Sequence, residues 1–312
     1  MNLGGKTFFA TLALAAAALW TAGCRPPPPS RELRLNPDSE PLPAQRYQRI
    51  VSLAPSLTQI LLALGIEDRV VGITDFCALP ADVGDIPRVG GYLDLNMERM
   101  VGLEPDLIVM LTVERTGLPR RLDRLGIDYL MVDNRTVSQI VESVVLIGNV
   151  VGASESAAAL TAAMRESMER IRRLARSQPT QRVLVCVGRG LEGASGEIYV
   201  AGPGSIYDQL LTMAGGENAY RGRLDYATLG RENIIRLNPE VIIELVETNG
   251  SSSVSPDQIR RHWQALGQHV KAVRSDRVHM IVGDHVMVPG VRIHHLLEDF
   301  VRALHPDSPE QP

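Results

Sequence analysis

The chain of 312 residues contains almost no lysine, few cysteines and no histidine before residue 262. Lysine occurs only at Lys6 and Lys271, and the net charge is −4 without any basic run, so neither a nucleic acid nor an anionic lipid surface is an expected partner. All seven histidines lie between residues 262 and 305. A bare zinc or manganese ion held between two halves needs ligands from both of them. We therefore expect no site for a free metal ion.

Sequence motifs of enzymes are scarce as well. The chain lacks a Walker loop and the Gly-x-Ser-x-Gly elbow of hydrolases. Residues 188–193 spell the glycine fingerprint of dinucleotide-binding proteins, but a turn and an extended segment follow where that fingerprint requires a helix. Asp284 and His285 could act as an acid–base pair. A cleft hydrolase or lyase acting on a small molecule is therefore the alternative to a protein that performs no chemistry.

The first 24 residues read as a targeting segment. Its apolar core, Thr7 to Trp20, is shorter than the ~20 residues that span a bilayer. It ends in a Thr-Ala-Gly-Cys sequence similar to a bacterial lipobox, with Cys24 as the lipidated residue, although an ordinary secretory signal is the alternative. Residues 25–47 are rich in proline and read as a tether that does not pack. We expect the folded body on the periplasmic or cell-surface side, anchored to the membrane through Cys24.

Two cysteines remain beyond the targeting segment. Cys186 lies within the apolar run 183–187, which reads as a buried strand, and Cys77 belongs to the other half of the chain. A disulfide between them would pin the two halves together. An oxidising compartment permits such a bridge, but we expect both thiols to be free.

The most informative pattern is an internal repeat at a spacing of 134 residues. In the first copy Tyr92 stands six residues before Glu98, and in the second copy Tyr226 stands six before Glu232. In both copies a proline, an acidic residue and an apolar run follow the glutamate. The repeat indicates two similar lobes, each with one aromatic residue and one carboxylate at equivalent positions. Two lobes that face each other enclose a cleft suited to a small molecule.

Alternation of strands and helices predicts two Rossmann-like α/β lobes with mainly parallel sheets. The N-terminal lobe is expected at residues 48–153 and the C-terminal lobe at residues 179–312. Ser56 and Ser154 are expected to be N-caps of helices. Strands are expected at residues 49–53, 70–73, 106–111, 129–132, 182–187, 241–246 and 278–282.

Residues 154–178 contain no helix breaker and read as one long helix that links the lobes. At 1.5 Å per residue it is ~35 Å long, about the width of a domain. A single helix is stiffer than several flexible connections, so we expect limited hinge motion between the lobes.

Together these features resemble the periplasmic binding proteins for cobalamin, ferric siderophores and haem, which are the substrate-binding lipoproteins of ABC importers. The resemblance covers residues 48–306. It implies a monomer that has no cofactor of its own, captures a metal chelate between its lobes and delivers it to a permease dimer with a cytoplasmic ATPase. The matching segments are residues 50–56, 71–74, 89–92, 96–99, 104–108, 214–218, 231–239, 289–292 and 305–306.

The resemblance also assigns roles to the repeated residues. In that family one glutamate on each lobe docks into arginine pockets of the permease, and the matching residues are Glu98 and Glu232; solvated helix carboxylates are the alternative. In the cobalamin-binding members tryptophans from both lobes stack around the corrin. Tyr92 and Tyr226 stand at those places, and Phe76 matches a third aromatic residue. Tyrosine in place of tryptophan leaves the chelate open, and local packing of these rings is the alternative.

Three further candidates follow predicted strands at their carboxyl ends, where open α/β sheets bind ligands. Ser56 is one of them. Arg189 could pair with a ligand phosphate or carboxylate, or form a surface salt bridge. His285 could ligate the metal centre of a chelate, or be an ordinary hydrogen-bonded histidine.

Overall fold

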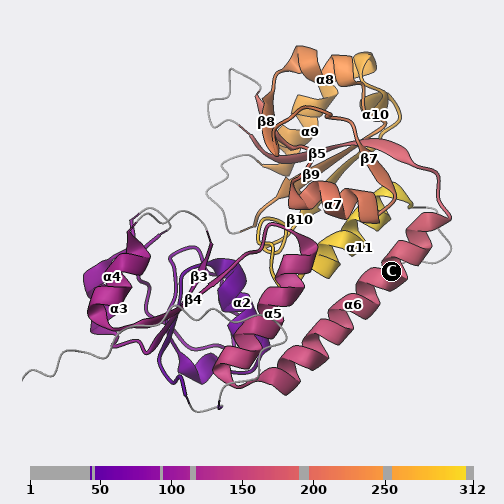
Figure 1. The fold of residues 1–312 in the computed structure, drawn as a ribbon. Coiled ribbons are helices and arrows are strands. Elements are labelled where there is room, and N and C mark those ends of the chain that lie inside the picture. The colour runs from indigo at the N-terminus through magenta and orange to yellow at the C-terminus, as the bar shows by residue number, and fades with distance from the viewer. Residues whose placement is uncertain are drawn as a thin grey trace, which may run out of the picture.

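The computed structural model describes residue 43 and residues 46–91, 94–112, 117–189, 197–248 and 255–306. Within these residues the chain forms two α/β lobes joined by helix α6 (Ser154–Arg176), which runs along one side of the molecule (Figure 1). The expected targeting segment, the tether up to residue 42, Cys24 and Tyr92 lie outside the described residues.

The N-terminal lobe contains a parallel sheet covered by helices on both faces. Leu107 and Val109 of the third strand pack with the first helix and with α5 (Val137–Val151), whereas Ile108 and Met110 pack on the opposite face. This alternation is expected of a strand buried on both faces. The strands, in spatial order, are β2 (Val70–Gly72), β1 (Ile50–Ser52), β3 (Leu107–Leu111) and β4 (Asp128–Val132). The helices are α2 (Pro55–Ala63), η1 (Glu67–Arg69), α3 (Met97–Gly102), α4 (Leu118–Leu125) and α5 (Val137–Val151).

The C-terminal lobe contains a mixed sheet in the order β10, β9, β5, β6 and β8, with β7 also paired to β5. Its strands are β5 (Gln181–Arg189), β6 (Ile198–Ala201), β7 (Gly216–Asn218), β8 (Tyr226–Leu229), β9 (Val241–Val246) and β10 (Val278–Val282). Its helices are α7 (Ile206–Met213), α8 (Arg231–Leu237), α9 (Pro256–Gln264), η2 (Gly267–His269), α10 (Lys271–Arg274) and α11 (Ile293–Leu304).

The predicted α/β lobes and parallel central strands are confirmed, but the second sheet departs from the expectation at one edge. There β6 and β8 are antiparallel to their neighbours. Strands β7 and β8 were not expected, because each has only three or four residues and is stabilised by its place in the sheet. Tyr226 is the first residue of β8.

Both predicted serine caps are wrong. Helix α2 begins at Pro55, whose fixed φ suits the first helical position, so Ala54 is the N-cap and Ser56 lies inside the first turn. Helix α6 begins at Ser154 itself, with Ala153 as its N-cap. Neither cap residue offers a side-chain acceptor to the helix.

The internal repeat is reflected in a pair of equivalent contacts, which we call the brace. In each lobe an arginine at the first strand of the sheet donates hydrogen bonds to a carbonyl at the end of a helix. The guanidinium group of Arg49, just before β1, donates to the carbonyl of Leu103 after α3 at 2.6 and 3.0 Å. In the second lobe Arg182 of β5 donates to the carbonyl of Leu237 at the end of α8, at 2.8 Å. The two copies of the repeat thus fix α3 and α8 against equivalent strands.

The segment after each of these helices repeats as well. Glu104 and Asn238, which directly precede the repeated prolines, both have left-handed φ values, 48° and 44°. The acidic residue after each proline then accepts from the backbone of the first strand. Asp106 accepts from the Arg49 N–H at 3.0 Å, and Glu240 accepts from the Arg182 N–H at 3.0 Å. Much of the repeated sequence is therefore explained by folding.

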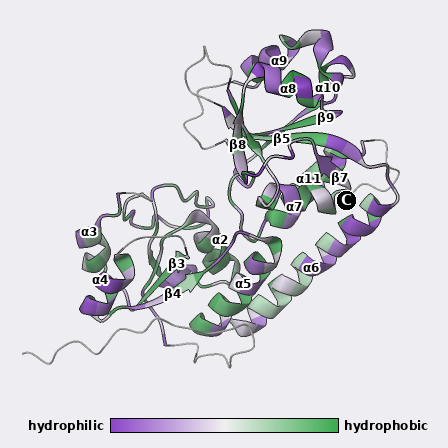
Figure 2. Cartoon of the chain, turned by 45° about the horizontal axis from the view of Figure 1, so that its top comes forward, coloured by the Kyte–Doolittle hydropathy of each residue, from purple (hydrophilic) through white to green (hydrophobic). Residues whose placement is uncertain are grey.

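The lobes also meet beside α6, in a junction formed by loops at the carboxyl ends of their strands. The Asn134 side chain donates to Ser56 Oγ at 3.3 Å and to the Pro289 carbonyl of the other lobe at 3.5 Å. The N–H of Val137, at the start of α5, donates to Gln209 of α7 at 3.3 Å. A single apolar core continues from one lobe to the other through α5, α6, α7 and α11. Figure 2 shows α5 and the adjoining half of α6 as mainly hydrophobic, whereas the other end of α6 is hydrophilic.

Candidate functional site

Two exposed tyrosines lie on one face of the C-terminal sheet. Ala227 and Leu229 of β8 are buried in the core, so Tyr226 and the alternate residue Thr228 point to the opposite face. Tyr199 of β6 is paired with Thr228 and lies on the same face. Tyr226 is 50% exposed and Tyr199 is 43% exposed. Tyr226 and Tyr199 are diagonal neighbours at this register, and such neighbours are ~7–8 Å apart, so both side chains belong to the same part of this face.

Tyr226 is supported by a buried tyrosine that connects it to the junction between the lobes. The ring of Tyr207 meets the ring of Tyr226 edge to face, with centroids 6.4 Å apart. The Tyr207 hydroxyl donates to the carbonyl of Val286 at 3.0 Å, in the segment that reaches the other lobe at Pro289. Burial raises the pKa of Tyr207, and the neighbouring Tyr226 and Glu247 raise it further. Tyr207 therefore remains a neutral hydrogen-bond donor.

Among the described residues of the N-terminal lobe, Phe76 is the exposed aromatic residue, with 70% of its surface accessible. The conformation of its loop is stabilised by Arg88, which donates to the carbonyls of Thr74, Asp75 and Cys77 at 2.7 to 3.1 Å. The Phe76 ring rests against Gly91, where a Cβ would lie 3.1 Å from its Cε2 atom. The loop thus holds the ring on the surface directly beside residue 91. The predicted partner Tyr92 is the next residue in the chain and lies outside the described residues.

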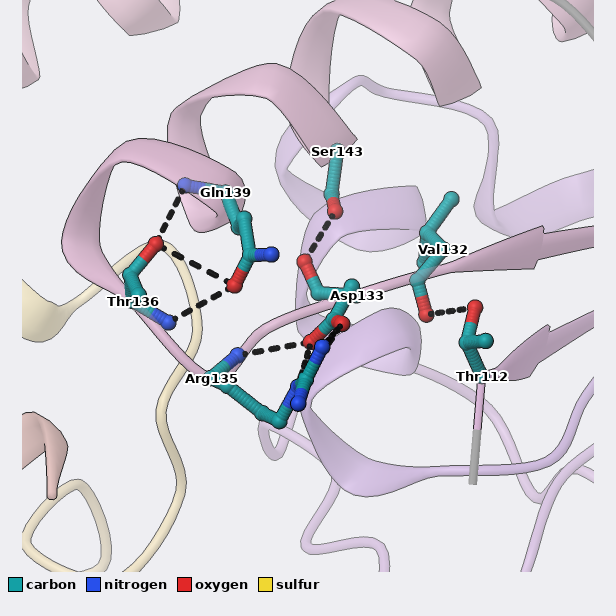
Figure 3. A network of polar contacts seen from close by, with 7 residues as sticks. All are labelled: Thr112, Val132, Asp133, Arg135, Thr136, Gln139 and Ser143. Carbon is teal, nitrogen blue, oxygen red and sulfur yellow. Dashed lines mark hydrogen bonds and ion pairs between the residues drawn. The ribbon is translucent and has the colours of Figure 1, made fainter. Parts of the chain in front are cut away.

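The connection from β4 to α5 places an exposed arginine at the same junction (Figure 3). Thr136 and Gln139 form a capping box that starts α5. Arg135 Nε donates to the Asp133 carboxylate at 2.8 and 3.0 Å, and the Ser143 hydroxyl donates to the Asp133 carbonyl at 3.1 Å. Figure 3 also shows Thr112, whose hydroxyl donates to the Val132 carbonyl and ties the end of β3 to β4.

The electrostatics of this connection reach across to the other lobe. The Arg135 guanidinium lowers the pKa of Asp133. The pKa of Arg135 is raised, mainly by its bond to Asp133 and in addition by the charge of Asp225. Asp225 directly precedes Tyr226. The charge of Asp225 in one lobe thus acts on Arg135 in the other.

Arg189, predicted to bind ligand, is instead committed to a buried ion pair. Its Nε and a terminal nitrogen donate to the two oxygens of Glu244 at 2.7 and 2.8 Å, and its side chain is 10% exposed. The guanidinium lies over the Trp263 ring at 5.1 Å, and the Trp263 N–H donates to Glu244 at 3.0 Å. Burial raises the pKa of Glu244, and Arg189 opposes that rise. With all these partners inside the lobe, Arg189 is not available to a ligand.

Ser56 also differs from its prediction. It is 3% exposed, and its hydroxyl accepts from Asn134. A Cβ on Gly290 would lie 3.4 Å from the Ser56 backbone, so the segment from the other lobe packs directly over it. Ser56 therefore stabilises the junction between the lobes and does not line a ligand surface.

His285 is paired within its own lobe. Its Nε2 lies 2.9 Å from the Asp299 carboxylate of α11, which matches the alternative of an ordinary hydrogen-bonded histidine. The neighbouring Asp284 accepts from Arg292 at 2.9 and 3.0 Å, and this bond lowers its pKa. Its carboxylate is 4.0 Å from His285 Nδ1. Both members of the possible acid–base pair are thus engaged with other groups.

The two repeated glutamates occupy equivalent exposed positions. Glu98 is the second residue of α3, and Glu232 is the second residue of α8. Within the residues that the structure describes, neither carboxylate forms an ion pair. Helices α3 and α8 lie in different lobes and far apart in Figure 1. Each lobe therefore presents one carboxylate on a helix that the repeat braces.

Other candidate chemistry in the described part of the chain is limited. No group of three or more histidine, cysteine, aspartate or glutamate side chains is placed to hold a metal ion among the described residues. Cys77 and Cys186 are free and buried in different lobes. No helix in the described ranges has the length and hydropathy needed to cross a membrane.

Tyr199, Tyr207 and Asp225 are not among the site residues predicted from the sequence. Alternation of buried and exposed residues along β6 and β8 could have found Tyr199 together with Tyr226. Tyr207 gave no such signal, because its partners Tyr226 and Val286 are distant in sequence.

Two α/β lobes, joined by one long helix and carrying exposed aromatic side chains near their junction, define a class of two-lobed solute-binding proteins. The chain belongs to the periplasmic binding protein family, whose sequence pattern matches residues 50–283. Its role is accordingly to bind a solute. The alternative of a cleft hydrolase or lyase is therefore set aside.

Individual relatives agree with this assignment. The chain is 26% identical to an uncharacterized ABC transporter substrate-binding lipoprotein, YvrC, of Bacillus subtilis, over 95% of this chain and 96% of the relative. It is 28% identical to the vitamin B12-binding protein of Yersinia pestis, over 71% of this chain and 76% of the relative. The crystal structure of a possible iron-binding (periplasmic solute-binding) protein from Staphylococcus epidermidis has the same fold. Its TM-score is 0.70 at 23% identity, covering 84% of this chain and all of that one.

Proposed function

We propose that this protein captures a metal chelate between its lobes and delivers it to the permease dimer of an ABC importer, whose cytoplasmic ATPase drives uptake. The observation that carries the proposal is that each lobe exposes aromatic side chains, Tyr226 with Tyr199 on one lobe and Phe76 on the other. Aromatic faces bury a wide apolar area against a large conjugated ring. A corrinoid is the leading ligand, supported by the similarity to a vitamin B12-binding protein. Ferric siderophores and haem are the other chelates to test.

The position of the protein in the cell follows from the same proposal. Lipidation of Cys24 would hold the body on the periplasmic or cell-surface side through the tether of residues 25–47. The name of the Bacillus subtilis relative, a substrate-binding lipoprotein similar over 95% of this chain, supports the anchor. Glu98 and Glu232 would dock into the two permease subunits, and one monomer would serve one permease dimer.

The deciding experiment is a calorimetric titration of residues 25–312 with cobalamin, haemin and a panel of ferric siderophores. We expect cobalamin to bind at micromolar affinity or tighter, about −8 kcal/mol or better. Binding of an iron chelate alone would retain the transport proposal and change the ligand. Absence of binding to every chelate would overturn the chelate proposal.

Tyr226 is the residue to change first. Replacing Tyr226 by alanine removes one ring of the stacking surface, so we expect the affinity for the bound chelate to fall about tenfold, or ~1.4 kcal/mol, in the same titration. Tyr226→Phe keeps the ring and should bind nearly as well as the wild type. Leu125→Ala is the matched control, because Leu125 is also exposed but is the last residue of α4, before the amino end of β4 and away from the junction at the carboxyl ends of the strands. Equal affinity of Tyr226→Ala and wild type would exclude Tyr226 from the site.

A further inference from the structure

A cluster of buried polar side chains adjoins the turn that carries Phe76. Each is 3% exposed or less, and they are Ser52 of β1, Thr58 of α2, and Thr74 and Cys77 of the turn. The Cys77 sulfur lies 3.2 Å from the hydroxyl of Thr58 and 3.2 Å from that of Thr74. The Thr58 hydroxyl in turn donates to Ser52 Oγ at 2.8 Å. Cys77 therefore connects the turn to both β1 and α2.

The hydrogen bonds of this cluster run in one direction. The Ser52 hydroxyl donates to the Ala54 carbonyl at 3.2 Å. Because Thr58 gives its one proton to Ser52, the Cys77 thiol is the donor toward Thr58. The sulfur then accepts from the Thr74 hydroxyl. An apolar side chain at position 77 would leave the buried Thr74 hydroxyl without this acceptor, which is costly inside a protein.

The backbone of the turn is held from its other side as well. One guanidinium nitrogen of Arg88 donates to three carbonyls of residues 74–77. The Asp75 N–H donates to the Gly90 carbonyl at 3.1 Å. Between these contacts Phe76 itself is 70% exposed. A fixed backbone thus presents a ring that has few contacts of its own.

This turn belongs to the edge of the N-terminal sheet that faces the other lobe. Ser52 is the last residue of β1, and the turn follows β2. Ser56, in the first turn of α2, bonds to Asn134 at the junction between the lobes. The carboxyl ends of strands are where open α/β sheets bind ligands. Phe76 is therefore held at the edge of the sheet where a ligand is expected.

We infer that Cys77 and Arg88 are positioning residues for ligand binding, which act by holding the Phe76 ring in its binding orientation. The inference rests on the proposed function and adds two residues to its site. A loop that has to be ordered when the ligand arrives reduces the affinity, whereas a loop that is already fixed avoids this loss. Removal of either residue should therefore weaken binding through Phe76.

A cycle of variants in titrations of residues 25–312 with cobalamin tests this coupling. Phe76→Ala should weaken binding about tenfold and Cys77→Ala about fivefold. Cys77→Ala should have no further effect when residue 76 is already alanine, because the positioned ring is then absent. Cys77→Ser should bind nearly as well as the wild type, because its hydroxyl can bond to both threonines. Unchanged affinity of Cys77→Ala, or effects of the two alanine variants that simply add, would overturn the inference.

A readout that needs no ligand uses the scarcity of phenylalanine. Residues 25–312 contain only Phe76 and Phe300, so labelling with 4-fluorophenylalanine gives two sites for fluorine NMR. Phe300 is fully buried and provides the internal reference. In Cys77→Ala and in Arg88→Met we expect the Phe76 signal to move toward that of the free amino acid, while the Phe300 signal stays. An unmoved Phe76 signal in both variants would overturn the inference.

Cys186→Ala is the matched control, because Cys186 is a buried free thiol of the other lobe. It should change neither the affinity nor the Phe76 signal. An affinity loss equal to that of Cys77→Ala would mean that any buried thiol has this effect, and positioning would be excluded.

The failures of the inference and of the proposed function are distinguishable. If cobalamin does not bind but haemin or a siderophore does, the same cycle is measured with that chelate. A bound chelate that leaves the Phe76 signal unmoved would overturn the inference and retain the proposed function. Absence of binding to every chelate would overturn the proposed function itself.

Discussion

Glu244 is a charged residue inside an otherwise apolar strand of the C-terminal lobe. It accepts hydrogen bonds from both Arg189 and Trp263 and is 2% exposed. Removal of one member of a buried ion pair leaves the other charge uncompensated, which usually costs ~3–5 kcal/mol. Removal of either partner alone should therefore destabilise this part of the lobe.

We expect Glu244→Ala to lower the free energy of unfolding by ~3–5 kcal/mol in urea denaturation. The double variant Arg189→Met with Glu244→Leu should be less destabilised, because no buried charge remains. Glu98→Ala, at an exposed position, should lie within about 0.5 kcal/mol of the wild type. If the double variant is as unstable as Glu244→Ala, the lower free energy of unfolding is caused by altered packing and not by the unpaired charge.

Glu240 gives a pH-dependent contribution to stability. Its pKa is lowered, first by the hydrogen bond from Lys271 at 2.7 Å and then by the bond from the Arg182 N–H. A carboxyl whose pKa is lower in the folded state contributes stability above its ordinary pKa of ~4.3, and that contribution is lost as the pH falls through the folded-state pKa.

Glu240→Gln should therefore be less stable than the wild type by about 1 kcal/mol at pH 7. The difference should shrink as the pH falls below ~4.3 through the folded-state pKa, because the wild-type carboxyl then becomes protonated. Urea denaturation at a series of pH values measures it. A difference that is constant from pH 7 to pH 3 would mean that the charge of Glu240 contributes nothing.

At the scale of the elements, the long and buried ones could be predicted from sequence. The strands at residues 107–111 and 241–246 are apolar runs that follow a proline and an acidic residue, and both were expected within one residue of their observed bounds. Gly126 ends α4 with a left-handed φ of 70°, as its place after an apolar periodic segment predicts.

The remaining elements depend on contacts that sequence does not display. Strands β7 and β8 are short and exist because β5 and β6 supply their hydrogen-bond partners. The partner of Arg189 is 55 residues away. One signal was available: a glutamate inside the apolar run 241–246 requires a buried cation or donor, because charged residues are almost never fully buried without one.

Helix α6 is the element that sets the distance between the lobes. Ala162 and Ala163 are exposed near its middle, so their replacement changes helix stability without opening a cavity. We expect Ala162→Gly with Ala163→Gly to destabilise the helix by ~1 kcal/mol per residue. The distribution of distances between spin labels at Arg124→Cys and Arg236→Cys, one on each lobe, should broaden.

The control for that measurement is Ala162→Gln with Ala163→Gln, which keeps high helix propensity. The native thiols Cys77 and Cys186 are buried and should remain unlabelled. An unchanged distribution in the glycine variant would show that the junction at Asn134 and Pro289, and not α6, holds the lobes in place.

At the scale of the whole molecule, Glu98 and Glu232 test delivery separately from capture. Replacing both by alanine should abolish uptake of the ligand by cells that depend on this protein. The affinity for the ligand should be unchanged, because Glu98 and Glu232 lie on α3 and α8 and do not belong to the proposed ligand site. Exposed charges that face arginines set orientation and association rate more than affinity.

Uptake assays and titrations on the same double variant measure the two effects. The matched control is Glu155→Ala with Glu166→Ala, two exposed carboxylates of α6. Normal uptake by the variant of Glu98 and Glu232 would exclude the docking role.

The brace that Arg49 and Arg182 repeat fixes α3 and α8 in equivalent ways, so a partner with twofold symmetry could contact one such helix on each lobe. Such a partner could receive the protein in two poses related by a half-turn, with the glutamates exchanged. Only features unique to one lobe, such as the antiparallel edge formed by β6 and β8, would distinguish these poses. The protein could then deliver its ligand in either of these two orientations, and both would be equally productive.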